Sequence, residues 1–151
     1  MIGALVIAGV LLIINLVIGP GFARFRAELA FNLFRNGFEQ AAQGGNIKPF
    51  GVLDVILHDA QEYPIADEQT GYIREGVDFQ TGVWGIGSQT SYFGIVYTAE
   101  DLPLGFECVD LPLMLDGKSW YWSEKQTAGS GDNWQRILKF GDHWYYYEMH
   151  F

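Results

Sequence analysis

The segment from Ile2 to Ile18 constrains the fold of this chain most, because it runs for 17 residues without a charged side chain. Asn15 is its only clearly polar residue. At a rise of about 1.5 Å per residue, a helix of this length is at the short end of those that cross a bilayer. Core helices of soluble domains are rarely apolar on every face. The segment therefore predicts a transmembrane helix over residues 1–19 that anchors the chain.

A cleaved signal peptide is the alternative interpretation of this segment. Signal peptides carry a basic region before the apolar stretch and small residues at the cleavage site. Residues 1–18 contain no basic residue, and residues 22–24 make a poor cleavage site, so we favour a retained anchor. The arginines Arg24, Arg26 and Arg35 all follow the apolar segment. The positive-inside rule then predicts an inner-membrane protein whose remaining residues lie in the cytoplasm.

A second, amphipathic helix is predicted over residues 20–45, continuing from the anchor. Pro20 suits either the first turn of a new helix or a kink in a continuous one. Its charged residues follow one narrow stripe, and two apolar flanks remain: Phe22, Phe25, Leu29 and Leu33 on one, and Phe31, Phe34, Phe38 and Ala41 on the other. The sequence leaves three covers open for these flanks: the membrane interface, the chain's own β-domain, or partner helices.

The rest of the chain, residues 46–151, predicts one β-rich domain and therefore an α+β protein. Short β-branched and aromatic runs alternate there with Gly, Pro and Asp. Strands are expected near residues 51–58, 72–79, 83–86, 92–98, 106–109, 119–123, 134–140 and 143–150. The stretches between them do not suit crossover helices, so the sheet is expected to be mostly antiparallel, as a meander or half-barrel. Gly141-Asp142 suits a type II′ turn in the last hairpin.

Charge and cysteine content exclude several classes of protein. The chain carries nine basic and 18 acidic residues. Only Glu28 and Glu39, but three arginines, precede residue 46, so the remainder has a formal charge of −10. A surface of this sign repels nucleic-acid phosphates, and no nucleic-acid partner is expected. The lone Cys108 excludes an internal disulfide and is interpreted as a buried hydrophobe. No cofactor motif is present, so no cofactor is predicted.

An aromatic cluster is the strongest candidate for a binding surface. It comprises Trp120, Trp122, Trp134, Trp144 and Tyr146, which lie on the predicted strands of the last third of the chain. Strand alternation places half of the aromatic residues on each face of the sheet. One face must line the core, and an exposed aromatic patch on the other would bind a sugar, peptide, lipid or protein. The alternative is that large aromatic side chains fill a thin core.

His58, Asp59 and Glu62 form the weaker candidate for an acid–base or metal site. An imidazole and two carboxylates can hold a divalent ion or move protons. An anchored hydrolase or metal-dependent enzyme would use these residues in a pocket with Glu107 or Asp110. Their spacing matches no established metal motif, so neither a catalytic nor a metal residue is assigned.

Residues 1–45 resemble the type IV pilins and pseudopilins in their apolar N-terminal helix, their proline near position 20 and their amphipathic continuation before an antiparallel sheet. The chain departs from that family at Leu5, where the family usually has Glu, and in lacking paired cysteines. The resemblance implies an inner-membrane subunit that assembles helix to helix into a filament, with its sheet outside the cytoplasm.

Together these features predict a membrane-anchored, non-enzymatic binding or accessory protein. Its expected partners are the lipid bilayer and either another protein, as in a larger membrane complex, or further copies of the chain. A pilin-like structural subunit is the first alternative, and an anchored enzyme that uses His58, Asp59 and Glu62 is the second.

Overall fold

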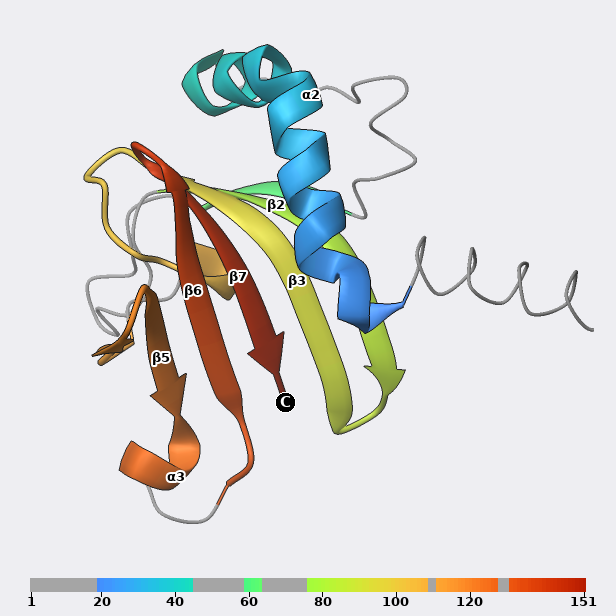
Figure 1. Cartoon of the computed structure of the whole chain (residues 1–151), viewed down its shortest axis with the longest axis vertical. Helices are drawn as coiled ribbons and strands as arrows, with labels where there is room; N and C mark the ends of the chain where they lie inside the picture. The colour runs from blue at the N-terminus through green and yellow to red at the C-terminus, as the bar shows by residue number, and fades with distance from the viewer. Residues whose placement is uncertain (1–18, 45–58, 64–75, 109–110, 128–130) are drawn as a thin grey trace, which may run out of the picture.

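The computed structural model describes residues 19–44, 59–63, 76–108, 111–127 and 131–151. They form an α+β unit in which one long helix packs against one face of an antiparallel sheet (Figure 1). No helix among these residues has both the length and the apolar character needed to cross a membrane. Apart from Gly19, the predicted anchor over residues 1–19 lies outside the described residues, so the transmembrane helix stays a prediction.

An extended residue and a short 3-10 turn precede the long helix. Gly19 is extended, with φ −69° and ψ 146°, and Pro20 follows at the start of a 3-10 turn, η1 (Pro20–Phe22). α2 (Ala23–Gly44) continues from this turn and bends at Phe34, where φ is −123°. Pro20 thus starts a new helix, because its fixed φ and missing N–H suit a first turn.

In the described residues, seven strands form a single sheet in the order β1-β2-β3-β7-β6-β5-β4, and all the pairs are antiparallel. The strands are β1 (Asp59–Tyr63), β2 (Gly76–Ile86), β3 (Gln89–Thr98), β4 (Met114–Asp116), β5 (Ser119–Ser123), β6 (Trp134–Gly141) and β7 (Trp144–His150). Two meanders, β1 to β3 and β4 to β7, are joined by a chain segment that crosses to the far edge. The antiparallel prediction is confirmed, but the order is not that of one simple meander.

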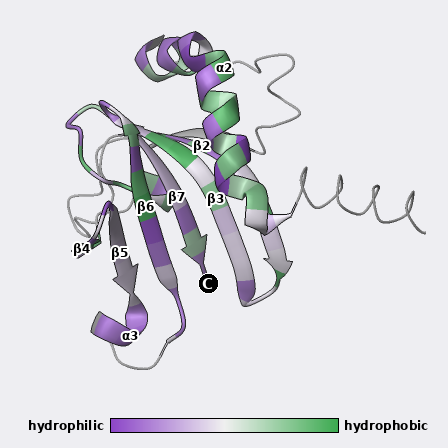
Figure 2. Ribbon diagram, viewed as in Figure 1, coloured by the Kyte–Doolittle hydropathy of each residue, from purple (hydrophilic) through white to green (hydrophobic). Residues whose placement is uncertain are grey.

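α2 covers one face of the sheet through the flank that contains Phe31 and Phe38. Residues Ala23, Ala27, Ala30, Phe31, Phe38 and Ala41 are buried against the sheet residues Val77, Phe79, Phe93, Ile95, Leu138, Trp144 and Tyr146. Figure 2 shows hydrophobic and hydrophilic residues interspersed along the whole of α2, as expected for a helix with one buried side. The sequence left three possibilities for what covers this flank of α2. The structure shows that the chain's own β-sheet covers it.

The opposite face is covered by the segment between β3 and β4. Leu102, Leu104, Phe106, Cys108 and Leu113 from this segment pack against buried sheet residues that include Val96, Tyr145 and Tyr147. The strand predicted over residues 106–109 is wrong, because residues Phe106–Cys108 form a 3-10 turn, η3. A four-residue helix, α3 (Glu124–Thr127), follows β5. Both faces of the sheet are therefore buried over much of their area.

Candidate functional site

The five aromatic residues predicted as a binding surface do not lie on one surface. Trp144 and Tyr146 are 2% and 0% exposed on the helix side of the sheet. The rings of Phe31 and Trp144 have centroids 5.1 Å apart, and those of Phe38 and Trp144 are 6.0 Å apart. α2 covers both side chains, so Trp144 and Tyr146 fill the core between helix and sheet, as the alternative interpretation expects, and do not belong to a binding surface.

Trp120 and Trp122 lie on the other face of the sheet. Both are half-buried and pack against the cluster that contains Val96 and Tyr145. The Trp120 ring meets that of Tyr145 edge-on at 5.9 Å. Strand alternation in β5 therefore separates these two tryptophans from Trp134, which faces the helix side.

Trp134 belongs to an aromatic stack on the part of the helix-side face that α2 leaves open. Its ring is stacked on that of His150 at 6.0 Å and 22°, and on that of Tyr121 at 6.5 Å and 24°. His150 Nδ1 is 3.0 Å from the Ser91 hydroxyl. Tyr121, Trp134, His150 and Ser91 are all half-buried, so part of each remains accessible to a partner.

Strand register extends this stack into a surface of mixed chemistry. His150 pairs with both Ser91 and Trp134, and in the next row Glu148 pairs with Arg136, which pairs with Tyr121. Arg136 is exposed, and Glu148 accepts a hydrogen bond of 3.1 Å from Tyr146. We name the six residues Ser91, Tyr121, Trp134, Arg136, Glu148 and His150 the open sheet face. Tryptophan, tyrosine and arginine are enriched in protein interfaces, and the open sheet face carries all three.

The weaker acid–base candidates are not brought into a described site. His58 and Asp110 lie outside the described residues, and for Asp59 and Glu62 the structure describes only the backbone of edge strand β1. Glu107 lies exposed in η3. In the described part of the chain, no three His, Cys, Asp or Glu side chains are grouped so that they would hold a metal ion.

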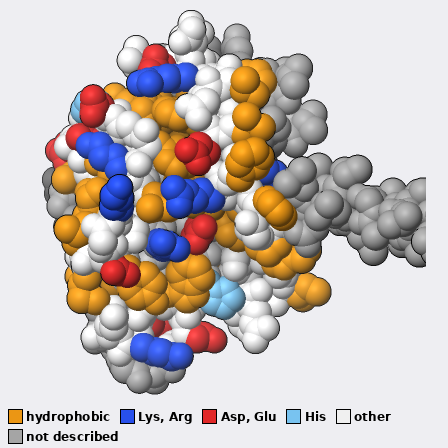
Figure 3. Space-filling model, in the orientation of Figure 1, with side chains coloured by type: hydrophobic (Ala, Val, Ile, Leu, Met, Phe, Trp, Pro, Cys, Tyr) orange, Lys and Arg blue, Asp and Glu red, His pale blue; other side chains and the backbone are white. Residues whose placement is uncertain are grey.

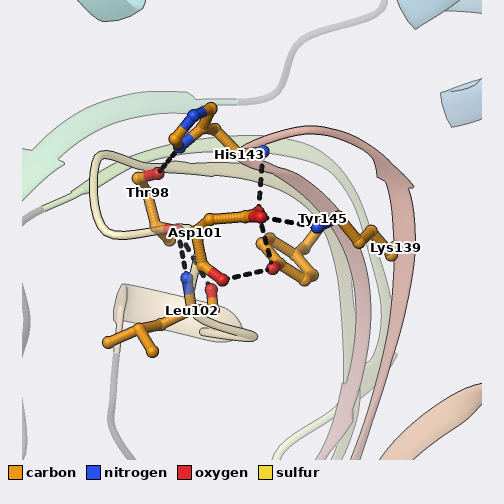
Figure 4. A network of polar contacts seen from close by, with 6 residues as sticks. All are labelled: Thr98, Asp101, Leu102, Lys139, His143 and Tyr145. Atoms are coloured by element: carbon orange, nitrogen blue, oxygen red, sulfur yellow. Dashed lines mark hydrogen bonds and ion pairs between the residues drawn. The ribbon is translucent and has the colours of Figure 1, made fainter.

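A polar network around Asp101 is a feature that the sequence does not indicate (Figure 4). One oxygen, Oδ1, accepts hydrogen bonds from the His143 backbone N–H at 2.8 Å and the Tyr145 hydroxyl at 2.8 Å. The other, Oδ2, lies 2.6 Å from Lys139 Nζ. This hydrogen bond from Lys139 is the main reason that the pKa of Asp101 falls to about 2. Burial, followed by the bond to Asp101, raises the pKa of Tyr145.

These protonation states fit a structural role for the network. A proton-transfer group works best with a pKa near the working pH, whereas Asp101 stays charged and Tyr145 stays protonated across the neutral range. His143 is held by Nδ1, which is 3.0 Å from the Thr98 carbonyl oxygen, in a backbone conformation of φ 67°. The network thus fastens the end of β3 to the β6–β7 turn.

On the face of the sheet opposite α2, a buried carboxylate holds the η3 turn against the strands. Asp78 is 4% exposed and accepts hydrogen bonds from the Tyr147 hydroxyl at 2.9 Å and the Glu107 backbone N–H at 2.9 Å. Cys108 is fully buried beside it, and burial raises the pKa of its thiol. A thiol that stays protonated is a poor nucleophile, so the interpretation of Cys108 as a buried hydrophobe is confirmed.

The second flank of α2 is exposed to solvent. Phe25, Leu29 and Leu33 are 55%, 47% and 66% exposed, and we name these three residues the outer stripe. Trp84 and Ile86, near the tip of the β2–β3 hairpin, are 47% and 92% exposed. Figure 3 shows hydrophobic side chains gathered over α2 at the right edge of the molecule, while basic side chains lie across the centre of this view.

Comparison of this chain with protein-family models, curated proteins and solved structures finds no match.

Proposed function

We propose that this chain is a membrane-anchored, non-enzymatic binding protein whose open sheet face holds a protein partner in a larger membrane complex. The observation that carries the proposal is the open sheet face, where Trp134 stacks between Tyr121 and His150 and part of each side chain is exposed. The uncharged segment from Ile2 to Ile18 precedes this domain in the chain and supports the anchor.

The chemistry of the polar groups favours binding over catalysis. Asp101 and Asp78 both accept hydrogen bonds that hold loops to the sheet. Binding surfaces, in contrast, gain most of their affinity from a few large aromatic and arginine side chains. Trp134, Tyr121 and Arg136 supply these side chain types on the open sheet face.

The orientation follows from the arginines that come after the uncharged segment. Arg24, Arg26 and Arg35 lie within 17 residues of Ile18, and such residues are retained on the cytoplasmic side. The partner is therefore expected to be a cytoplasmic protein or the cytoplasmic part of a membrane complex.

The anchor is tested by extracting membranes that contain the full chain with alkaline carbonate. We expect the protein to stay in the membrane pellet and to be released only by detergent. The double substitution Leu11→Arg and Leu12→Arg places two charges near the centre of the segment, at about 2.5–3.5 kcal/mol each, and should move the protein to the supernatant. The matched double variant Ala99→Arg and Gln126→Arg changes exposed sites and should behave as the wild type. Release of the wild-type chain by carbonate would refute the anchor.

The binding surface is tested by site-specific photo-crosslinking in native membranes. A photoreactive phenylalanine derivative at Tyr121 should capture one discrete protein, and Trp134→Ala should weaken that adduct. The same probe at Lys118, an exposed turn residue, serves as the control. Equal labelling at positions 121 and 118 contradicts the proposed surface, and adducts only between copies of the chain favour a homo-oligomer.

A further inference from the structure

We propose that the outer stripe of α2, together with the tip of the β2–β3 hairpin, lies in the headgroup region of the lipid bilayer, so that α2 runs along the membrane surface. This inference rests on the anchor proposed above and concerns a different surface from the open sheet face. It assigns an occupant to the flank of α2 that the β-domain leaves uncovered.

The outer stripe is a continuous apolar line on the solvent side of the helix. Phe25, Leu29 and Leu33 are spaced four residues apart, so they follow one another along one side of the helix for about 12 Å. The opposite side of the same turns, with Ala27 and Phe31, is buried against the sheet. An amphipathic helix with apolar groups on both sides needs a second apolar environment for the outer one.

The join between the uncharged segment and α2 allows the helix to lie along the membrane. The uncharged segment ends at Ile18, and Gly19 is extended, with φ −69° and ψ 146°. An extended residue directly before η1 lets α2 take its own direction relative to the part of the chain that precedes it. The outer stripe starts at Phe25, seven residues after Ile18. A segment that spans the bilayer therefore brings the outer stripe to the headgroup level.

The distribution of charge favours a membrane on the α2 side. Arg24 and Arg35 are exposed on α2, and Arg35 also pairs with Glu39 at 2.8 Å. The chain after residue 45 carries a formal charge of −10. Cytoplasmic leaflets are anionic, so they attract basic side chains and repel the acidic part of the domain. The difference in charge between α2 and the rest of the domain therefore favours an orientation in which α2 faces the lipid.

The hairpin tip adds a tryptophan at the same end of the molecule. A Cβ on Gly82 would lie 3.9 Å from Arg26 Nη2, which places the hairpin beside the first turns of α2. Figure 1 shows the β2–β3 hairpin and the start of α2 at the same end of the sheet. Trp84 and the 92% exposed Ile86 lie near this tip. Tryptophan is enriched at the level of lipid headgroups, which matches this position.

A second copy of the chain is the main competing occupant, and the size of the patch argues against it. Even an aromatic side chain buries only about 150–250 Å², so the exposed parts of Phe25, Leu29, Leu33, Trp84 and Ile86 together offer roughly 600 Å². Specific protein interfaces bury about 800 Å² on each partner. The bilayer has no such minimum area for a helix whose position is already set by an anchor.

The test uses nitroxide labels on the full chain reconstituted in vesicles of three parts phosphatidylcholine to one part phosphatidylglycerol. Cys108 is buried and its raised pKa makes it unreactive, so single cysteines at Leu29 and Leu33 can be labelled without removing it. Lys118→Cys, in an exposed turn, is the matched control. We expect labels at positions 29 and 33 to be accessible to oxygen and protected at least fivefold from a water-soluble nickel reagent, relative to position 118.

Flotation of the vesicles separates failure of this inference from failure of the anchor. If the protein floats but positions 29 and 33 meet the nickel reagent as position 118 does, the outer stripe faces water and the inference is wrong while the anchor stands. Dipolar coupling between labels on different copies would instead identify a second chain as the occupant, and would also overturn it. A chain that does not float refutes both proposals.

Discussion

At the scale of single residues, Asp101 shows how one carboxylate joins distant parts of the chain. It has φ 53°, an uncommon conformation for a residue other than glycine, and its side chain contacts Lys139, His143 and Tyr145. Asparagine tolerates this backbone conformation as well as aspartate does, so Asp101→Asn removes the charge without new strain.

We expect Asp101→Asn to destabilise the fold by about 1 kcal/mol at pH 7, a value kept small because the ion pair with Lys139 is partly exposed. The lowered pKa of Asp101, about 2, sets the pH dependence. A carboxylate with a depressed pKa stabilises the fold above its unfolded pKa of about 4 and loses that contribution as the pH falls toward 2. Urea denaturation of both proteins at pH 7 and pH 2 measures the difference, which should nearly vanish at pH 2. The exposed Asp142→Asn is the control, and an equal gap at both pH values would contradict this account.

Gly94 is a second residue whose role depends on a close contact. A Cβ at this position would lie 2.5 Å from ring atoms of Tyr147, which is fully buried on the adjacent strand. Gly94→Ala should therefore lower the free energy of unfolding by about 1–3 kcal/mol through overpacking. Gly141→Ala, where a Cβ meets nothing within 4 Å, should change it by less than about 0.5 kcal/mol. Thermal unfolding of the two variants gives the comparison, and similar losses in both would argue against the proposed clash.

The alternation of residues along a strand predicts which face of the sheet a side chain lies on, but it does not predict whether that face is exposed to solvent. The period of two in β7 correctly separates Trp144 and Tyr146 from Tyr145 and Tyr147. It did not indicate that both faces are covered, because the cover comes from α2 and from residues far along the chain. The same limit explains why Tyr121 and His150 were not singled out with Trp134: only the register of three strands brings them together.

At the scale of elements, α2 docks on the sheet through its buried side. Phe38 is fully buried, and its ring meets that of Phe79 edge-on at 5.0 Å. Phe38→Ala should destabilise the protein by about 3–5 kcal/mol, since it leaves a cavity between helix and sheet. Leu33→Ala changes an exposed position of the same helix and should cost less than about 0.5 kcal/mol. Guanidinium denaturation measures both, and equal losses would mean that α2 is not docked through its Phe38 side.

The ends of a helix or strand are predicted correctly where the hydrophobic pattern of that segment alone determines them. The strands over 119–123 and 134–140, and most of the last strand, agree with β5, β6 and β7. The sequence predicts two strands over residues 72–79 and 83–86, whereas from Gly76 onward they form one strand, β2, with an irregularity between Gln80 and Gly82. Short edge strands β1 and β4 were missed, because three to five residues with many polar side chains carry little periodicity.

Two errors arose from positive φ angles that neighbours impose. Glu107 and Cys108 have φ of 56° and 52°, which a strand does not allow, and the Asp78 carboxylate holds the Glu107 N–H in this turn. In the last hairpin the positive φ falls on His143 instead of Gly141, so the predicted type II′ turn at Gly141-Asp142 is wrong. The contacts of His143 with Thr98 and Asp101 support that conformation. Neither contact is local in sequence.

At the scale of the whole molecule, α2 and the sheet form one folding unit. The buried side of α2 and the sheet residues Phe79, Phe93, Ile95 and Trp144 share one hydrophobic cluster. A chain of residues 19–151 should therefore unfold in one cooperative transition, with the near-ultraviolet circular dichroism of packed aromatic residues.

A chain of residues 46–151 should behave differently, because removal of α2 uncovers the aromatic face of the sheet. An exposed apolar face of this kind promotes association and dye binding. We expect this shorter chain to bind a hydrophobic dye, to lose most of its near-ultraviolet signal and to elute as large species in size-exclusion chromatography, while residues 19–151 serve as the matched control. A monomeric 46–151 chain with native-like aromatic signals would show that the sheet folds alone and that α2 docks onto a finished domain. In that case α2 is free to leave the sheet, and its buried flank, as well as the outer stripe, becomes available to the membrane.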